Sequence, residues 1–292
     1  MGQTIIDIHP HIISGDTTRY PHNPLGGKRS DWSAERPFAV EQYLEEMKAA
    51  GVSRAAMVHS STTYGYDNSY VADSVMAHPQ ALVGVYSVDI CAPDAVKTIE
   101  GWRARGMAGL RLFGAGSTVQ TDGAWMIAPQ TLPVWNHMAD IGMTVAIQTT
   151  KIGLPVVEQI LTKFPKVTIV LDHLGRPDLS DGAPYANAAP LWALSRFENL
   201  FLKVTPRTFD LSQKSPATPD TFFPKLVAQY GANRLAWGSN FPANEGTLKD
   251  LVDQGHQCFA SLSQTDRDWI WAKTAQSLYP DLVTATPEEA RT

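Results

Sequence analysis

The chain has 292 residues, of which 43% are hydrophobic and 18% charged, and its formal net charge is −5. This composition is typical of a globular protein and excludes a disordered or fibrous chain. The negative charge argues against nucleic acid as the main partner, because binding to a phosphate backbone requires a basic surface. No apolar stretch approaches the roughly 18 residues of a membrane span. Two cysteines outside any CxxC pair, and an N-terminus without a signal-peptide pattern, predict a cytoplasmic protein with no membrane partner.

Short apolar and β-branched runs recur along the chain, separated by helix-like stretches. Most runs are nearly continuous in apolar residues, as in parallel strands that helices cover on the outside. We predict strands at 4–9, 54–59, 82–88, 108–113, 143–148, 167–172, 200–204 and 234–238.

The stretches between the strands carry helix boundary signals. Gly51 and Gly142 stand where C-cap glycines would end the first and fourth helices. Eight strand–helix alternations without a linker favour a single-domain (β/α)8 TIM barrel over residues 1–292, with a doubly wound open sheet as the alternative. Residues 14–37 form a long first loop over the expected catalytic face. We predict helices near 38–50, 68–77, 94–105, 129–141, 153–164, 184–198, 218–230 and 246–261.

The strongest local motif is Asp7-Ile8-His9-Pro10-His11, at the end of the first predicted strand. Because side chains alternate along a strand, His9 and His11 point to the same side. Two imidazoles in this arrangement can bind a divalent cation, polarise a carbonyl or share a proton. The alternative is that both rings only bond to loop carbonyls, and the motif alone does not choose between these roles.

Two further motifs place polar groups at the ends of other strands. The segment LDHLGRP puts His173 after the sixth strand, and WGSNFP puts Asn240 after the eighth. In a barrel these strand ends meet at one rim, where barrel enzymes carry their catalytic residues. We therefore predict one catalytic site that contains His9, His11, His173 and Asn240.

These motifs together resemble the amidohydrolase superfamily, in the branch that contains 2-pyrone-4,6-dicarboxylate lactonase and related sugar lactonases. The matching blocks follow the family order over nearly the whole chain, and each block alone is only moderately specific. The resemblance implies a TIM-barrel hydrolase. The blocks are HPH at 9–11, YGYDN at 64–68, GLRLF at 109–113, LDHLGRPD at 171–178, LKV at 202–204 and WGSNFP at 237–242.

The resemblance also implies that His9, His11 and His173 polarise the scissile carbonyl and stabilise the oxyanion. In the lactonases an Asp at the end of strand eight activates the attacking water, whereas this chain has Asn240. An amide cannot accept that proton, although it can orient water or donate to an oxyanion. Three explanations stay open: another base, such as His173 or Glu245; a reaction that needs no base there; or a substitution that silences turnover.

Metal-dependent relatives take ligands from the HxH motif, from a histidine at the end of strand five and from the Asp of strand eight. This chain has Gln148 and Asn240 at the last two positions, and both side chains are poor ligands for zinc. We therefore expect no tightly held metal cofactor, and at most weak binding of zinc or manganese.

Cationic side chains near the predicted rim indicate a small anionic substrate. Arg111 lies in the fourth strand, Arg176 after the sixth and Arg207 after the seventh, and a guanidinium group matches a carboxylate in shape. Lys203 in the seventh strand is a further candidate.

Other roles compete with substrate binding. Arg111 or Lys203 would alternatively form a structural ion pair with a barrel carboxylate such as Asp7 or Asp172. Tyr64, Tyr66 and Asn68 would cover the rim of the pocket, where Tyr64 and Asn68 would bind substrate, unless these loop residues only pack.

The sequence thus predicts a hydrolase that opens a lactone or similar cyclic ester of a small carboxylated molecule. One alternative is a metal-assisted decarboxylase or hydratase on the same fold, which would need the missing strand-five ligand. Another is a catalytically silent barrel that binds a small acid. The identity of the substrate and the oligomeric state, including a homo-oligomer, stay open.

Overall fold

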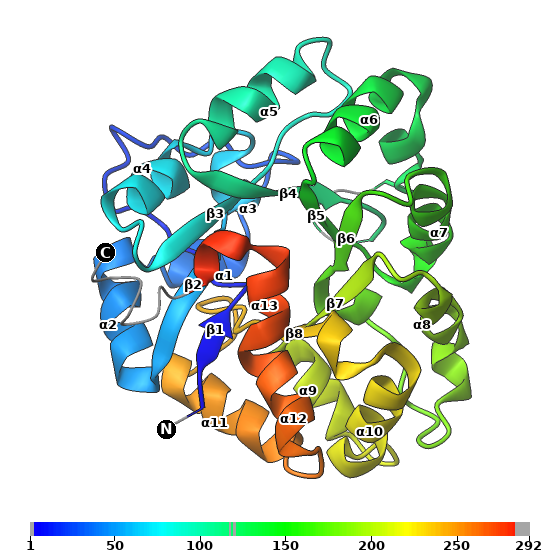
Figure 1. Ribbon diagram of the computed structural model, residues 1–292. Coiled ribbons are helices and arrows are strands. Elements are labelled where there is room, and N and C mark those ends of the chain that lie inside the picture. The colour runs from blue at the N-terminus through cyan, green and yellow to red at the C-terminus, as the bar shows by residue number, and fades with distance from the viewer. Residues whose placement is uncertain (1–2, 117, 119–120, 284–292) are drawn as a thin grey trace, which may run out of the picture.

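The computed structural model describes residues 3–116, 118 and 121–283. Eight parallel strands form one sheet in the order β1 to β8, and Figure 1 shows them around the centre of the molecule with helices outside. The backbone N–H of Ile8 donates to the carbonyl of Trp237 at 3.2 Å, which brings β8 back beside β1. The predicted (β/α)8 barrel is therefore confirmed, and the open-sheet alternative is wrong.

All eight predicted strands form, with ends that differ from the prediction by a few residues. Seven of the eight predicted helices also form as single helices. The strands are β1 (Ile5–Asp7), β2 (Val52–Val58), β3 (Leu82–Tyr86), β4 (Met107–Phe113), β5 (Thr144–Gln148), β6 (Thr168–Leu171), β7 (Leu200–Val204) and β8 (Leu235–Trp237). The helices are α2 (Val40–Ala50), α4 (Ser69–Ala77), α5 (Ala95–Arg103), α6 (Leu132–Asp140), α7 (Leu154–Lys163), α10 (Pro219–Tyr230) and α11 (Leu248–Cys258).

The helix predicted at 184–198 is wrong in length. Only α8 (Ala189–Ala193) is α-helical, and short 3-10 turns flank it on both sides. Tyr185 has φ 63, so the chain before α8 cannot continue a right-handed helix.

Small and β-branched side chains fill the interior of the barrel, and the larger aromatic residues pack between the strands and the surrounding helices. Such filling makes the barrel a packed core and not a pore, which leaves only its ends for a ligand. The interior residues from the strands and their ends are Ile6, Ile8, Ala56, Val58, Val83, Val85, Ala146, Val170 and Ala236.

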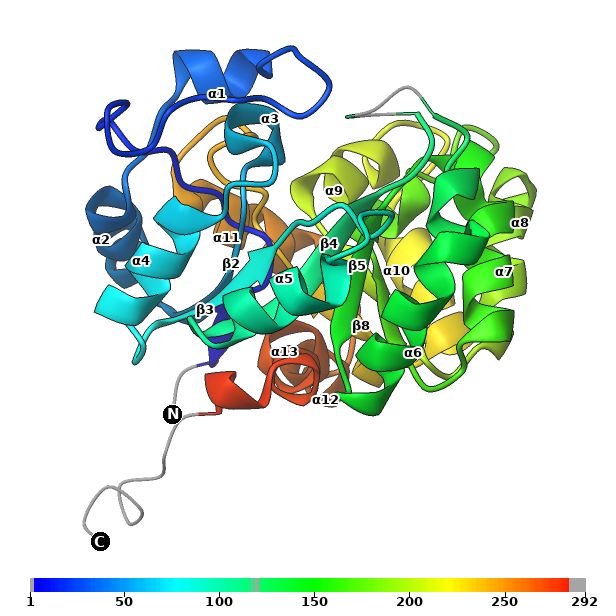
Figure 2. The same cartoon turned by 90° about the horizontal axis from the view of Figure 1, so that it is seen from above.

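Short C-terminal helices that the sequence did not predict close one end of the barrel. The helix α12 (Gln264–Asp268), a π-helical turn (Trp269–Lys273) and α13 (Thr274–Leu278) lie together there, opposite the long loops, as Figure 2 shows. Tyr279 packs into the barrel at Gly109, where a Cβ atom would lie 2.8 Å from the tyrosine ring. The N-terminal ends of the strands are therefore sealed.

The opposite end carries the long loops and three more short helices. They are α1 (Asp31–Glu35), α3 (Ser61–Tyr64) and α9 (Pro206–Ser212), each after the C-terminal end of a strand. In Figure 2 these helices lie on the far side of the barrel from α12 and α13. Among the described residues, no helix combines the length and apolar character needed to cross a bilayer.

Candidate active site

Three histidines meet at the C-terminal end of the barrel. The ring centroid of His9 lies 5.0 Å from that of His11 and 4.8 Å from that of His173, in edge-to-face contact. All three side chains are buried, and His9 is fully enclosed beneath the other two. The structure thus brings together imidazoles from β1 and β6 that are 162 or more residues apart in the sequence.

A left-handed turn presents His173 to the site. After β6, residues His173, Leu174 and Arg176 have φ angles of 52°, 54° and 56°, and Gly175 lies between them at 66°. Such conformations cost about 1–2 kcal/mol for each residue with a side chain. In a 3-10 turn, residues three positions apart project in the same direction, so His173 and Arg176 face the same side of the turn. Backbone strain of this kind is typical of functional sites.

Asp7 links the segments that follow β1 and β8, behind the histidines. Its carboxylate accepts hydrogen bonds from the backbone N–H groups of His9 at 2.9 Å and Ser239 at 2.8 Å. The hydroxyl groups of Tyr43 and Ser239 donate to its other oxygen. Burial raises the pKa of Asp7, and these donors oppose that shift. Asp7 therefore positions His9 and the segment that leads to Asn240.

A buried ion-pair network lies against His9. Arg111 Nε donates to Asp172 Oδ2 at 2.8 Å, and Lys203 Nζ lies 3.0 Å from Asp172 Oδ1. Lys203 Nζ also lies 3.1 Å from His9 Nδ1. Burial by itself would raise the pKa of Asp172, but the charges of Lys203 and Arg111 hold it below its ordinary value. Of the two structural pairings considered from the sequence, the one with Asp172 forms and the one with Asp7 does not.

The histidines are neutral at physiological pH. Burial, reinforced by the nearby cationic groups, lowers the pKa of His9 and of His173 well below the usual value. The pKa of His11 falls to about 3 for the same reasons, although its hydrogen bond to the carbonyl of Val58 works in the opposite direction. Neutral imidazoles can each donate or accept one hydrogen bond at the ring nitrogen that faces the cavity.

Asn240 occupies the position that follows β8. Its φ angle of 53° lies in the left-handed region, which Asn adopts more readily than most residues. The Nδ2 group donates to Asn244 Oδ1 at 2.6 Å, and the side chain is buried. Asn240 therefore lies in the site with its amide already oriented by a neighbour.

A cavity of about 60 Å³ lies among these groups. Arg176 and Arg207 reach it, and neither forms an ion pair with a carboxylate in the described part of the chain. The Nε atom of Arg176 is buried without a hydrogen-bond partner among the described residues. The cavity is lined by His11, Trp32, Ser60, Ser61, Thr62, Arg111, Phe113, Thr118, Gln148, His173, Arg176, Arg207, Asn240 and Ala243.

Two residues predicted to bind substrate lie outside this cavity. The hydroxyl of Tyr64 accepts a hydrogen bond from the backbone N–H of Ser14 at 2.8 Å, beneath the first loop. Asn68 is fully buried, and its amide bonds to both the N–H and the carbonyl of Ser87 at 2.9 Å. Both side chains are engaged in holding loops together. Lys203 likewise contacts His9 and Asp172 and does not line the cavity.

Glu245, considered as a base, does not line the histidine cavity. Its side chain is 89% exposed and lies 3.6 Å from Arg36. The exposed position and the ion pair with Arg36 do not favour Glu245 as the base.

Sequence reasoning missed several residues that line the cavity. Trp32 in α1 stacks on His11, with ring centroids 5.3 Å apart. Ser60, Ser61 and Thr62 directly follow β2, and their position after a strand end was a signal that could have found them. Trp32 had no such signal, because it lies within the long first loop.

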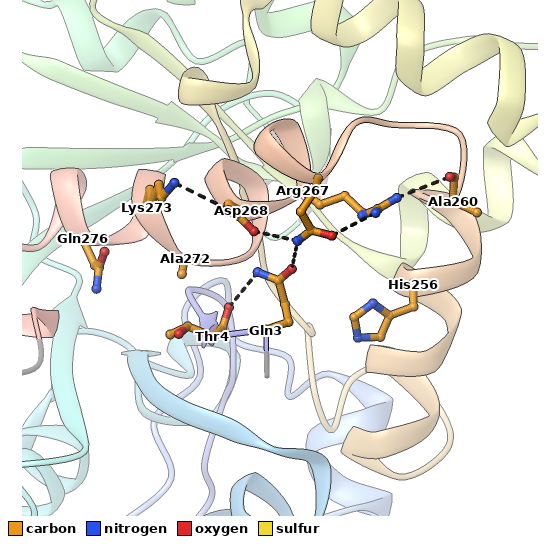
Figure 3. Close-up of a pocket in the computed structure, with 10 residues that line it drawn as sticks. Gln3, Thr4, His256, Ala260, Arg267, Asp268, Ala272, Lys273 and Gln276 are labelled. Atoms are coloured by element: carbon orange, nitrogen blue, oxygen red, sulfur yellow. Dashed lines mark hydrogen bonds and ion pairs between the residues drawn. The ribbon is translucent and has the colours of Figure 1, made fainter. Parts of the chain in front are cut away.

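A larger cavity, of about 850 Å³, lies at the opposite end of the barrel. The Gln264 amide donates to Gln3 Oε1 and to Asp268 Oδ1. Arg267 donates to the carbonyl of Ala260, as Figure 3 shows. The polar groups there satisfy one another, and the N-terminal ends of barrel strands carry stability more often than catalysis. We therefore take the smaller cavity as the candidate active site.

The donor set of the histidine site does not suit a zinc ion. Among the described residues, no group of three or more His, Cys, Asp or Glu side chains is arranged to hold a metal. Gln148 and Asn240 supply amides at the two remaining positions, and Gln148 accepts a hydrogen bond from Thr118 at 3.0 Å. The residues present therefore do not fit the metal centre of metal-dependent relatives.

Comparison with known proteins identifies the family. The amidohydrolase family model matches residues 6–280, and the chain belongs to this family. A 2-pyrone-4,6-dicarboxylate hydrolase from Comamonas testosteroni is 24% identical over 262 residues, which are 86% of this chain and 80% of that protein. An L-fucono-1,5-lactonase from Burkholderia ambifaria is 25% identical over 215 residues, which are 72% of this chain and 71% of the relative. The predicted resemblance to the lactonase branch is confirmed.

Solved structures share the fold. A protein provisionally named as a 2-pyrone-4,6-dicarboxylic acid hydrolase, from Pseudomonas putida, has a TM-score of 0.77 and 24% identity, covering 97% of this chain and 100% of that one. An amidohydrolase from Burkholderia multivorans with bound zinc has a TM-score of 0.75 and 17% identity, covering 95% and 99%. A 2,6-dihydroxybenzoate decarboxylase from Rhizobium has a TM-score of 0.69 and 13% identity, covering 96% and 99%. The fold thus occurs in proteins of different chemistry.

Proposed function

We propose that this amidohydrolase opens a lactone or similar cyclic ester of a small carboxylated molecule. The observation that carries the proposal is one cavity lined by the imidazoles of His11 and His173 and by the guanidinium groups of Arg176 and Arg207, which have no ion-pair partner among the described residues. The ring of His9 packs against both imidazoles. Both named relatives have names that refer to hydrolysis of a cyclic ester. A carboxylated substrate also matches the net positive charge around the cavity.

In the proposed reaction, water attacks the lactone carbonyl and the ring C–O bond then breaks, which gives a hydroxy acid. Imidazoles of His9, His11 and His173 surround the carbonyl oxygen, where negative charge develops. Arg176, Arg207 and the free face of Arg111 hold the substrate carboxylate. Asn240 orients the attacking water, because its amide is fixed by Asn244 and has no useful basicity.

The first experiment is a screen of the purified protein against carboxylated lactones and related cyclic esters, followed by the variant His173→Ala on the best substrate. We expect kcat to fall by about 100-fold or more while the protein stays folded. His137→Ala is the matched control, because His137 lies on the surface beside Glu100, and should leave turnover unchanged. Full activity of His173→Ala would remove His173 from the mechanism.

The variant Asn240→Asp tests the alternative hypothesis that the protein binds a small acid but has no catalytic activity. If the natural protein hydrolyses none of the panel and Asn240→Asp does, the chain is a lactonase silenced at this position and the proposal fails. If the natural protein is active and Asn240→Asp is slower, the amide has the proposed role. Asp is suited to this variant because it also tolerates a left-handed backbone.

We also propose that the reaction needs no resident metal, on the strength of the amides at Gln148 and Asn240. Metal analysis of the purified protein after dialysis provides the test. One equivalent of zinc or manganese that survives dialysis would overturn this part of the proposal and would favour the metal-assisted decarboxylase or hydratase.

A further inference from the structure

A buried lysine contacts a histidine of the candidate site. Lys203 is fully enclosed, and its Nζ atom lies 3.1 Å from His9 Nδ1 and 3.0 Å from Asp172 Oδ1. A lysine buried this completely is uncommon unless it is paired. Lys203 has no role in the reaction proposed above.

The contacts of Asp172 indicate that Lys203 is the donor toward His9. Arg111 donates to the Oδ2 atom of Asp172. The Oδ1 atom forms no hydrogen bond with the described residues, and the Lys203 Nζ atom lies beside it at 3.0 Å. A buried carboxylate oxygen without a donor is costly, which favours an ammonium group at this position. An ammonium group has three donors and no acceptor. His9 Nδ1 lies 3.6 Å from Asp172 Oδ1, too far for a hydrogen bond between these two groups.

We propose that Lys203 holds His9 in the tautomer with its proton on Nε2, so that His9 donates a hydrogen bond into the site. Since Nδ1 accepts from Lys203, a neutral His9 must carry its single proton on Nε2. The Nε2 atom is buried and has no hydrogen-bond partner in the described part of the chain. His9 does not line the cavity of about 60 Å³, so a ligand would meet this donor only by extending beyond that cavity, toward the contact of His9 with His11 and His173.

His11 takes the opposite tautomer. Its Nδ1 atom lies 2.8 Å from the carbonyl oxygen of Val58, which can only accept, so the proton of a neutral His11 is on Nδ1. The Nε2 atom then carries a lone pair. Burial lowers the pKa of His11 to about 3, which keeps this lone pair free of a proton in the neutral pH range. The two histidines of the HPH motif thus differ, one being a donor and the other an acceptor.

This division refines the proposed hydrolysis and rests on it for its catalytic meaning. His9 would donate to the lactone carbonyl oxygen. His11 has a lone pair on Nε2 and cannot donate to that oxygen, so it would instead accept a hydrogen bond from the attacking water and orient it together with Asn240. Lys203 is a positioning residue that acts through His9. The same division disfavours a divalent cation between the rings, because the cation needs a lone pair on both Nε2 atoms. His9 could supply one only by moving its proton to Nδ1, against the ammonium of Lys203.

NMR of protein labelled with ¹⁵N in the histidine rings tests the tautomers without any substrate. The long-range ¹⁵N–¹H correlations of a neutral histidine differ between its two tautomers, and His9→Gln and His11→Gln variants identify the two spin systems. We expect an Nε2–H form for His9 and an Nδ1–H form for His11 at pH 7. An Nδ1–H form for His9 would overturn the proposal even if the protein is an active lactonase.

The variant Lys203→Met tests the role of the lysine. We expect the His9 signals to shift toward a mixture of tautomers and kcat to fall by about 100-fold, with KM changed little, as for the loss of one oxyanion donor. Lys151→Met is the matched control, because Lys151 is 57% exposed and pairs with Asp178. An unchanged His9 spectrum in folded Lys203→Met would refute the role of Lys203. If Lys203→Met does not fold, the spectrum of the natural protein still decides the tautomers.

The two proposals fail separately. Absence of lactonase activity together with the expected spectra would refute the proposed function and leave the tautomer assignment standing. Lactonase activity together with the opposite tautomers would refute the tautomer assignment and leave the proposed function standing.

Discussion

At the scale of single residues, close approach of the backbone matters as much as the chemistry of the side chains. Gly238 follows β8 where the chain passes His9, and a Cβ atom on Gly238 would lie 2.6 Å from His9 Cβ and 3.1 Å from His9 N. Both contacts are with atoms that cannot move without moving the backbone. Only glycine at this position allows β8 to close against β1 with His9 in place.

The variant Gly238→Ala should therefore displace His9. We expect a loss of about 1–3 kcal/mol in the free energy of unfolding, as for other overpacked sites, together with a large fall in kcat. Urea unfolding and steady-state kinetics measure the two effects. Gly101→Ala is the control, because its Cβ would meet nothing within 4 Å in a helix and should stabilise the protein by about 0.5–1 kcal/mol. Equal behaviour of the two variants would contradict the packing argument.

Arg207 provides a second prediction at this scale. It lines the cavity without a carboxylate partner in the described residues, so its guanidinium group is available to a substrate carboxylate. We expect Arg207→Gln to raise KM about 10–100-fold for a carboxylated lactone, in line with the loss of a charged hydrogen bond of about 1.5–3 kcal/mol. KM for a neutral lactone should change little. Arg196→Gln, a surface residue paired with Glu158, is the control.

At the scale of elements, each strand delivers its functional groups at its C-terminal end, and buried polar contacts hold those ends together. Asn68, at the start of α4, is an example, because its amide bonds to the backbone of Ser87 just after β3. This contact joins the loops of two neighbouring strands. Asn68 thus holds two loops together and does not line the cavity.

The variant Asn68→Ala should accordingly reduce stability and leave substrate affinity nearly unchanged. Removal of the amide leaves the N–H and carbonyl of Ser87 buried without these partners, and each such group costs about 1–3 kcal/mol. Thermal or urea unfolding measures the loss, and KM of the folded variant measures affinity. A large rise in KM without a loss of stability would show that Asn68 contacts the substrate after all.

At the scale of the whole molecule, burial of neutral histidines makes stability depend on pH. Burial is the main cause that lowers the pKa of His11 to about 3 and that of His59 to about 4, from 6.5. Below pH 6.5 the unfolded chain binds protons on these rings that the folded protein does not, so stability is lost as the pH falls. Asp7, with its raised pKa, acts in the opposite direction at lower pH.

We expect the free energy of unfolding to fall by at least about 4 kcal/mol between pH 7 and pH 5, because His11 and His59 each contribute up to about 1.4 kcal/mol per pH unit and the lowered pKa values of His9 and His173 add to the fall. Urea titrations at pH 7, 6 and 5 measure this change. A stability that is constant over this range would contradict the view that these rings are neutral in the folded protein. The variant His59→Gln, outside the histidine cavity, should reduce this fall by about 2 kcal/mol.

The sequence alone determined the eight strands, the barrel and the positions of His9, His11, His173 and Asn240 at strand ends. These features follow from local periodicity, and parallel strands in a barrel point their C-terminal ends to one side. Only the tertiary structure decided that Lys203 and Asp172 meet behind His9, that Trp32 stacks on His11, and that Tyr64 and Asn68 turn away from the cavity. The short C-terminal helices that seal the barrel are also a feature that only the tertiary structure showed. Such contacts join residues far apart in the chain, and their partners depend on packing in three dimensions, which local residue patterns do not encode.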